Sequence, residues 1–342
     1  MSERVLVGMS GGVDSAAAAL LLKRAGYEVI GVTFRLFDGE GIRDAASICE
    51  RLGIPHTVCD LETCFHREVI GRFIDAYERG ETPNPCVTCN RYIKFSKMLE
   101  LADSLGAKYV ATGHYARVER AENGEYCLRK AVDEGKDQSY FLYTLSQAQL
   151  SRILFPLGDY TKAEVREMAE QNGFVNARKR DSQDICFVRD GDYASFIEAY
   201  TGKVFPEGEY IDPEGRVLGK HKGAIRYTVG QRKGLGIALG RHAFVLEKNM
   251  QENTVTLGSN EDLFCSTLTA WDACFLSEIT EHQPRRVCAK VRNTQKQTPA
   301  TVTRLDGTRF RVDFEEPQRA VSRGQSVVLY EGDRVLGGGI IE

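Results

Sequence analysis

The feature that most constrains this chain is a glycine-rich turn near its start, placed between an apolar run and a run with helical spacing. The apolar run "RVLVGM" (Arg4–Met9) is typical of a buried strand, and "GMSGGVDS" (Gly8–Ser15) leads directly into the alanine-rich "SAAAALLLKRAG". Glycines let the backbone curl, so that N–H groups and a helix N-terminus point at an anion. The turn has neither the Lys of a Walker loop nor the G-x-G-x-x-G of a dinucleotide loop. It therefore predicts a phosphate site of another kind.

Three further apolar runs alternate with helical patterns in the first part of the chain. They are "EVIGVTF" (28–34), "PHTVCDL" (55–61) and "KYVATG" (108–113). Between the first two, "RDAASICERLG" has helical spacing and ends in glycine. This alternation predicts an α/β fold with a doubly wound parallel sheet, covered on both faces. Ligands bind such sheets at the carboxyl ends of the strands, where Thr112–His114 would also lie.

The residue pattern changes twice in the rest of the chain. "ERAENGEY" predicts a hairpin or mobile loop, and "YTKAEVREMAEQNGF" predicts a helix with a capping box of Thr161 and Glu164. After about Gly202 the sequence is glycine-punctuated and β-branched, and from Arg285 it alternates apolar and polar residues around "DG" and "EGD" turns. We expect an α/β domain over residues 1–200, a small β-rich domain over 201–262 and a C-terminal β-barrel over 263–342.

Composition and charge narrow the class of protein. Hydrophobic residues make up 42% and charged residues 27% of the 342, as in a globular enzyme. No apolar run approaches the roughly 20 residues of a bilayer span and no targeting segment is present, so we expect a cytoplasmic protein without membrane association. The net charge of −3 is uneven, since residues 285–342 hold eleven Lys/Arg and seven Asp/Glu, and residues 217–240 hold five Lys/Arg and no acid. Such segments suit a polyanionic partner, although a solvated surface explains them equally well.

The stretch "TPNPCVTCN" (Thr82–Asn90) places a C-x-x-C pair, Cys86 and Cys89, on what reads as a conformationally fixed Pro-Asn-Pro turn. Zinc binding, redox exchange, iron–sulfur clusters and nucleophilic catalysis all use this spacing. The ten cysteines are scattered, which argues against a disulfide framework in a reducing compartment. Structural zinc needs four ligands, and with the distant Cys186 this set has three.

The S-G-G-x-D-S sequence of the first turn resembles the pyrophosphate loop of the PP-loop ATPases. Four further motifs extend the likeness: "NPCVTCN", "KDQSYFLY" (136–143), "RDSQDICFV" (180–188) and "YTVGQRKGLG" (227–236). Together the five motifs resemble the bacterial tRNA-specific 2-thiouridylases over nearly the whole chain. The resemblance to PP-loop ATPases implies ATP cleavage between the α- and β-phosphates, AMP transfer to a substrate oxygen, and Mg²⁺ near Asp14.

The thiouridylase resemblance implies a specific reaction. ATP adenylates the C2 oxygen of the wobble uridine of tRNA, and sulfur then displaces AMP. Cys186 would carry a persulfide received from a donor protein, a cysteine desulfurase or a relay. Cys89 would attack that persulfide, releasing hydrosulfide and leaving a transient Cys89–Cys186 disulfide. Cationic side chains nearby, such as Arg178, Lys179 and Arg180, would favour the thiolates.

The resemblance also carries binding roles over to individual positions. For ATP they are Gly8, Met9, Ser10, Gly11, Gly12, Val13, Asp14, Ser15, Phe34 and Gly113. For tRNA they are Asn84, Pro85, Cys86, Lys136, Asp137, Gln138, Arg292 and Asn293. His114 is expected to be structural, and Phe34 by itself reads as ordinary core packing.

Two departures from the family pattern bear on the sulfur chemistry. Cys86 stands where the family commonly has Asp, and Gln183 with Asp184 stands where a Thr-Gly pair is common. One hypothesis is that Asp184 supplies the missing carboxylate. A second is that Cys86, Cys89 and Cys186 hold a 4Fe–4S cluster whose free iron carries the sulfur. A third is that Cys86 is a tolerated replacement.

Two rival functions remain. A PP-loop synthetase that adenylates a small molecule would leave the basic C-terminal barrel and "YTVGQRKGLG" unexplained. An RNA- or metal-binding protein without catalysis would not need S-G-G-x-D-S intact.

Overall fold

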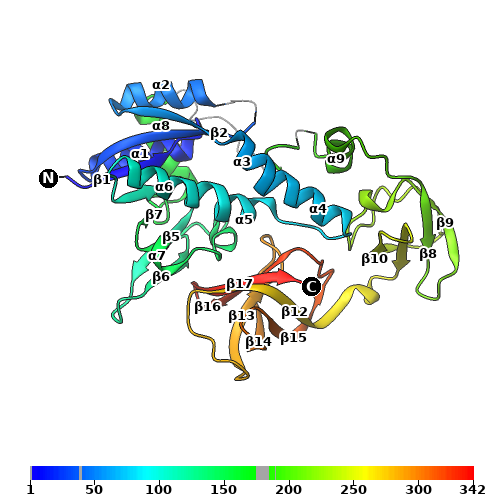
Figure 1. Cartoon of the computed structure of the whole chain (residues 1–342). Coiled ribbons are helices and arrows are strands. Elements are labelled where there is room, and N and C mark those ends of the chain that lie inside the picture. Colours follow the sequence, from blue (N-terminus) through cyan, green and yellow to red (C-terminus); the bar gives the residue numbers. More distant parts are fainter. Residues whose placement is uncertain (1, 38–40, 175–184, 189) are drawn as a thin grey trace.

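The computed structural model describes residues 2–37, 41–174, 185–188 and 190–342. Three bodies follow one another along the chain: an α/β domain, a small four-stranded sheet and a β-barrel (Figure 1). In Figure 1 the barrel lies below helix α5 and the four-stranded sheet lies at the right. No helix in the described part of the chain combines the length and apolarity that crossing a bilayer would take.

The α/β domain is built on a parallel five-stranded sheet in the order β3-β2-β1-β4-β7. Its strands are β1 (Arg4–Gly8), β2 (Glu28–Arg35), β3 (His56–Asp60), β4 (Tyr109–Ala111) and β7 (Ile153–Leu154). The sheet and its first four strands confirm the sequence prediction, while the two-residue β7 was not predicted. Since β4 lies beside β1 on the side away from β2, the chain reverses direction across the sheet between them, which is where such folds place ligands.

Helices cover both faces of this sheet. Helices α1 (Val13–Arg24), α2 (Ile42–Leu52) and α8 (Lys162–Gln171) share a core with Val5 and Val7, whereas α6 (Phe95–Ser104) shares a core with Leu6 on the opposite face. Side chains of β1 thus alternate between the two faces, as a strand requires. The capping box of Thr161 and Glu164 is present at the start of α8, as predicted.

Two composite helices extend from the sheet toward the other bodies. One joins α3 (Glu62–Phe65), a π-helical stretch η1 (His66–Gly71) and α4 (Arg72–Glu78), and the other joins α5 (Pro85–Cys89), a π-helical stretch η2 (Asn90–Lys94) and α6. The predicted Pro-Asn-Pro turn was wrong from residue 85 on. Asn84 is the extended N-cap and Pro85 the first residue of α5, a position that suits proline because its missing N–H would have no intrahelical partner there.

The polar segment "ERAENGEY" forms a hairpin of β5 (Ala116–Arg120) and β6 (Tyr126–Lys130). Unexpectedly, β6 also pairs with the barrel strand β17 through Arg129 and Arg334. Asp333 accepts hydrogen bonds from Arg117 at 2.7 Å and from Arg129 at 2.5 Å. The hairpin therefore joins the α/β domain to the barrel as one continuous sheet.

The middle body is a four-stranded sheet in the order β10-β11-β8-β9, preceded by helix α9 (Tyr193–Thr201). Its strands are β8 (Gly208–Ile211), β9 (Val217–His221), β10 (Phe244–Asn249) and β11 (Thr254–Gly258). The remaining short helices are η3 (Ser139–Phe141), α7 (Gln147–Leu150), η4 (Ala224–Arg226) and η5 (Glu261–Leu263).

The C-terminal body is the expected barrel. Its strands are β12 (Phe264–Phe275), β13 (Arg285–Lys290), β14 (Thr298–Arg304), β15 (Phe310–Arg319), β16 (Ser326–Glu331) and β17 (Arg334–Ile341). Strand β12 pairs with both β15 and β17, which closes the six strands around a core that includes Phe310 and Val327. At Gly338 an added Cβ would lie 2.9 Å from the ring of Tyr143, so glycine there lets the α/β domain approach the barrel closely.

Candidate active site

The loop after β1 is held in a tight curl by two serine hydroxyls. Ser15 Oγ donates to the carbonyl of Gly12 at 3.0 Å and accepts from the N–H of Ser10 at 3.2 Å, while Ser10 Oγ accepts from the N–H of Gly12 at 3.3 Å. Gly12 is the N-cap of α1, so the positive end of that helix faces the loop. This is the arrangement of backbone donors that binds phosphate groups.

Close packing fixes the loop against its neighbours. Gly11 has φ 74°, and an added Cβ would lie 2.6 Å from the carbonyl oxygen of Gly41. A Cβ on Gly113 would lie 2.7 Å from the backbone carbonyl carbon of Asp14. The ends of β1 and β4 therefore meet, and Gly113 adjoins the loop. Phe34 is half-buried at the end of β2.

Most of the other predicted ATP residues fall into two groups. The side chains of Met9 and Val13 are buried in the core, so these two residues can offer an anion their backbone alone. Ser10, Gly12 and Asp14 keep some exposed surface at the same sheet edge. The structure thus brings the loop positions and Gly113 together, and their binding of ATP stays a prediction.

Asp14 has partners that the sequence did not reveal. The ammonium of Lys162 donates to both carboxylate oxygens at 2.8 Å, and the hydroxyl of Tyr115 donates at 2.9 Å. The Lys162 side chain is 8% exposed and that of Asp14 is 32% exposed, so the lysine is removed from water while the carboxylate keeps some contact with it. A lysine at the first position of a helix opposes the helix dipole, and that misplacement is the sequence signal that could have marked it.

This pairing also bears on the expected Mg²⁺. The carboxylate of Asp14 is already charge-balanced by Lys162 and hydrogen-bonded by Tyr115, so it does not present itself as a free metal ligand. The observed contacts do not fit the expected Mg²⁺ at Asp14, and we derive no step through a metal there.

The imidazole of His114 packs against aromatic rings, and its structural role stays a prediction. Its ring lies 5.7 Å from the ring of Phe95 and 6.0 Å from that of Phe155, and Nδ1 shares a hydrogen bond of 2.7 Å with Thr112 Oγ1. Burial, followed by the charge of Lys94, holds the pKa of His114 well below its usual value. The imidazole is therefore neutral at physiological pH.

The predicted catalytic thiols lie close together in space. Cys89 is 7% exposed in a core formed with the helices α4 and α9, whereas Cys86 and Cys186 are exposed. Both residues that flank Cys186, Ile185 and Phe187, pack in the same core as Cys89, and the charges of ionised Cys186 and Cys86 would each raise the pKa of Cys89. All three are free thiols. Ring contacts anchor the neighbourhood, since Phe187 lies 5.8 Å from Phe65 and 5.1 Å from Phe73.

The thiols are not activated as they stand. Burial raises the pKa of Cys89 to about 12, and partial burial also raises the pKa of Cys186 although that residue keeps exposed surface. The charge of Lys94 opposes both shifts. The expected cations Arg178, Lys179 and Arg180 lie outside the described residues, as do Gln183 and Asp184.

Lys94 is a second residue that sequence reasoning missed. It ends the π-helical stretch η2, in which the N–H of Phe95 donates to the carbonyl of Asn90, five residues back. A π-turn brings residue i+5 to the face that residue i+4 holds on an α-helix, which places Lys94 on the side of Cys89. In the described part of the chain, its ammonium has neither a carboxylate partner nor a hydrogen bond.

The three cysteines do not form a ligand set. Among the described residues no three Cys, His, Asp or Glu side chains converge as metal ligands would, and this includes Cys86, Cys89 and Cys186. One thiol is buried and two are exposed, whereas a 4Fe–4S cluster needs its thiolates around one volume. As arranged here, the donors do not fit the cluster hypothesis.

The predicted tRNA residues near the hairpin make contacts within the protein. Asp137 accepts from the N–H groups of Ala131 at 3.1 Å and Ser139 at 3.2 Å, and the side-chain oxygen of Gln138 accepts from the N–H of Tyr115 at 3.0 Å. These two side chains thus shape the loop behind Tyr115. Lys136 is half-buried in the preceding turn.

Arg292 and Asn293 follow β13 at the edge of the barrel. Arg292 donates to the carbonyl of Ala320 and, at 3.2 Å, to Ser322 Oγ, and burial together with the nearby charge of Arg319 lowers its pKa. No carboxylate in the described ranges lies within ion-pair distance of Arg292. A Cβ on Gly230, from "YTVGQRKGLG", would lie 4.0 Å from its guanidinium, so the two basic segments meet there.

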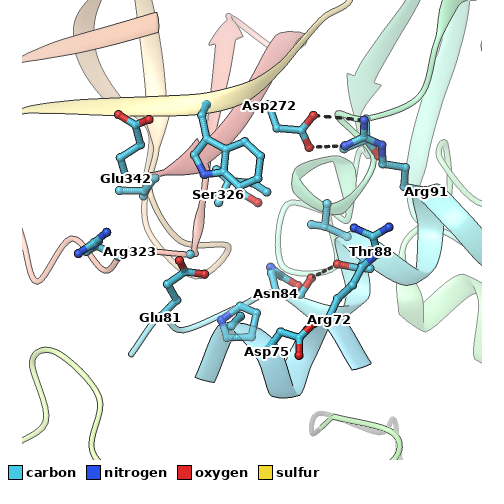
Figure 2. Close-up of a pocket in the computed structure, with 18 of the residues that line it drawn as sticks. Arg72, Asp75, Glu81, Asn84, Thr88, Arg91, Asp272, Arg323, Ser326 and Glu342 are labelled. Atoms are coloured by element: carbon cyan, nitrogen blue, oxygen red, sulfur yellow. Dashed lines mark hydrogen bonds and ion pairs between the residues drawn. The ribbon is translucent and has the colours of Figure 1, made fainter. Parts of the chain in front are cut away.

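The exposed face of α5 borders a cavity of about 870 Å³ between the α/β domain and the barrel (Figure 2). Asn84 lines it, whereas Pro85 is buried, and neither Cys86 nor Cys89 belongs to its lining. The predicted tRNA residues on α5 are therefore split between two faces of one helix.

Comparison with known proteins covers the whole chain. Three family models match in sequence: the tRNA methyl transferase HUP domain over residues 3–190, the tRNA methyl transferase PRC-barrel domain over 194–259, and the aminomethyltransferase β-barrel domain over 265–341. The chain is 47% identical to the tRNA-specific 2-thiouridylase MnmA of Clostridioides difficile (strain 630), covering 100% of this chain and 99% of that protein. It is also 47% identical to the MnmA of Acetivibrio thermocellus, over 99% of each.

These full-length matches agree with the fold and with the five motifs. At this identity and coverage, the chain belongs to the family of the bacterial tRNA-specific 2-thiouridylases.

Proposed function

We propose that this protein catalyses the ATP-dependent 2-thiolation of the wobble uridine of tRNA. The observation that carries the proposal is the full-length match to the tRNA-specific 2-thiouridylases, in a chain that combines a tightly curled glycine-rich loop at the start of α1 with the thiols of Cys89 and Cys186.

The first step uses the loop after β1. Its N–H groups and the N-terminus of α1 hold the pyrophosphate portion of ATP, while the C2 oxygen of uridine attacks the α-phosphorus and pyrophosphate leaves. The Asp14–Lys162 pair keeps the start of α1 in place during this exchange. ATP supplies the AMP group that turns the C2 oxygen into a leaving group.

The second step uses the thiols. Cys186 carries a persulfide, and the thiolate of Cys89 attacks its inner sulfur, so that the S–S bond breaks and hydrosulfide departs. Hydrosulfide attacks C2 of the adenylated uridine and AMP leaves with the bonding electron pair. The Cys89–Cys186 disulfide that remains is returned to two thiols by a dithiol reductant.

Further parts of the proposal follow from the same family membership. A persulfide-carrying protein, a cysteine desulfurase or relay, would load Cys186, and the enzyme would work in the cytoplasm. Asn84, Cys86, Lys136, Arg292 and Asn293 are proposed to contact tRNA, and domain boundaries near residues 200 and 262 stay part of the proposal.

The test measures AMP formation from ATP and 2-thiouridine in tRNA, with a persulfide donor and a dithiol present. We expect AMP only when tRNA is added, and one thiolated uridine per AMP at early times. AMP formation without RNA would instead support a small-molecule synthetase, and binding of tRNA without ATP consumption would support a non-catalytic RNA-binding protein.

A further inference from the structure

The cavity between α5 and the barrel is separate from the thiol site. From the N-cap of α5, from α5 and from η2 the lining takes Asn84, Val87, Thr88, Arg91 and Tyr92, a spacing close to that of one helical face. Cys86 and Cys89 lie on the other face, where Cys89 is buried against α4 and α9. The cavity and the thiols thus lie on different faces of the same composite helix.

The opposite wall of the cavity comes from the barrel and holds Trp271, the only tryptophan in the chain. Trp271 lies on β12 and is 45% exposed, so its indole is not part of the hydrophobic core. Next to it, Asp272 has φ 52° and accepts hydrogen bonds from Arg91 at 2.5 and 3.3 Å. This ion pair ties η2 to β12 beside the cavity (Figure 2).

Several polar groups of the lining have unmet hydrogen-bonding capacity. The side-chain amide of Asn84 makes no hydrogen bond within the described ranges, and Thr144 Oγ1 is buried without a partner. The guanidinium of Arg323 has no carboxylate within ion-pair distance among the residues described. An aromatic face together with amide, hydroxyl and guanidinium groups is the set that recognises an unpaired nucleobase.

Charge argues for a base rather than a phosphate group. The lining contains four arginines and four carboxylates, so their formal charges cancel. They are Arg72, Arg79, Arg91, Arg323, Asp75, Glu81, Asp272 and Glu342. A cavity of about 870 Å³ without net charge suits an uncharged heterocycle.

Resting on the proposed function, we propose that this cavity receives an unpaired base of the tRNA near the modified position, stacked on Trp271 and hydrogen-bonded by Asn84. The base would enter on one face of α5 while the target uridine is processed on the other. The helix would thus be gripped from both sides by neighbouring parts of the same RNA loop.

The fluorescence of Trp271 can report whether a base binds in the cavity. We expect its fluorescence to be quenched when the full chain is titrated with unmodified tRNA, and not when it is titrated with a fully paired RNA duplex of similar length. Trp271→Ala should raise the Kd for tRNA by about 5- to 150-fold, the range for losing one base–aromatic stack. Trp271→Phe should retain most of the affinity.

Phe264→Ala is the matched control, because Phe264 lies on the same strand, is 46% exposed and does not line the cavity. Unchanged fluorescence at saturating tRNA would overturn the inference, as would equal losses in the two alanine variants. Quenching by UMP or AMP alone would also overturn it, in favour of a small-molecule site. If tRNA is thiolated while Trp271 is not quenched, the proposed function stands and this inference fails. If Trp271 is quenched while no ATP is consumed, this inference stands and the proposed function fails.

Discussion

The loop after β1 and the thiol pocket around Cys89 are built in opposite ways. In the loop, Asp14 has both a cation and a hydroxyl partner, and the serines satisfy each other. In the thiol pocket, Cys89 is buried with a raised pKa and Lys94 has no carboxylate partner among the described residues. The side chains of the loop are therefore already paired, whereas burial holds the thiol of Cys89 in its protonated form.

The largest effect should come from removing the buried nucleophile. Cys89→Ser should reduce 2-thiouridine formation at least about 10³-fold, since the hydroxyl cannot displace hydrosulfide from a persulfide. Formation of AMP and pyrophosphate in the presence of tRNA should persist, because the loop is independent of the thiols. Mass spectrometry of the tRNA and a pyrophosphate assay measure the two steps separately. Loss of both steps together would show that the two regions are not separable.

The next effect should come from breaking the paired carboxylate of the loop. Lys162→Met leaves Asp14 without its cation and should lower tRNA-dependent pyrophosphate release about 10²-fold. It should also destabilise the fold by about 1–3 kcal/mol, less than the loss of a fully buried ion pair would, because Asp14 is 32% exposed. Urea unfolding and the pyrophosphate assay check these outcomes. Lys97→Met, which removes the exposed pair with Glu100, is the control and should change neither. Full activity in Lys162→Met would contradict the role given to the pair.

Titration should distinguish the thiol pocket from the loop. Because burial raises the pKa of Cys89 to about 12, its alkylation rate should rise about tenfold per pH unit from pH 7 toward that value. Lys94→Met removes the charge that opposes this shift, so alkylation and thiolation near pH 8 should fall about tenfold, and Lys94→Arg should restore them. Peptide mass spectrometry of alkylated Cys89 gives the rate. A plateau below pH 9 in the parent would contradict the buried-thiol description.

The smallest effect is expected for Cys86. Since the three cysteines do not converge as ligands, Cys86→Asp should leave thiolation within about threefold, and protein purified without oxygen should contain no iron or acid-labile sulfide in either form. Iron and sulfide analysis beside the activity assay checks this. About four irons in the parent and few in the variant would instead restore the cluster hypothesis.

Local patterns predicted the parts of the fold that local physics determines. The first turn, the four strands of the sheet and the capping box at Thr161 follow from glycine placement, apolar runs and side-chain hydrogen bonding within a few residues. The barrel followed from alternation between turn signals. The same reasoning read Asn84 and Pro85 as a fixed turn, although both residue types also begin helices.

What the sequence could not predict depends on distant or cooperative geometry. Lys162 reaches Asp14 across 148 positions, and no periodicity connects them. The π-turn that moves Lys94 to the side of Cys89 adds no distinctive residue to the sequence. The pairing of β6 with β17 is one residue long, and no local pattern in either strand predicts it.

The pairing of β6 with β17 has a consequence for which position of a bound RNA would reach the loop after β1. Because a hairpin of the α/β domain continues into the barrel sheet and is clamped by Asp333, the span between barrel and phosphate loop has a fixed length. An RNA held by the barrel would present the same nucleotide to the loop in every encounter. The hairpin would then set the distance between the two sites, so that the modified position is selected by its distance along the RNA and not by the identity of the base alone.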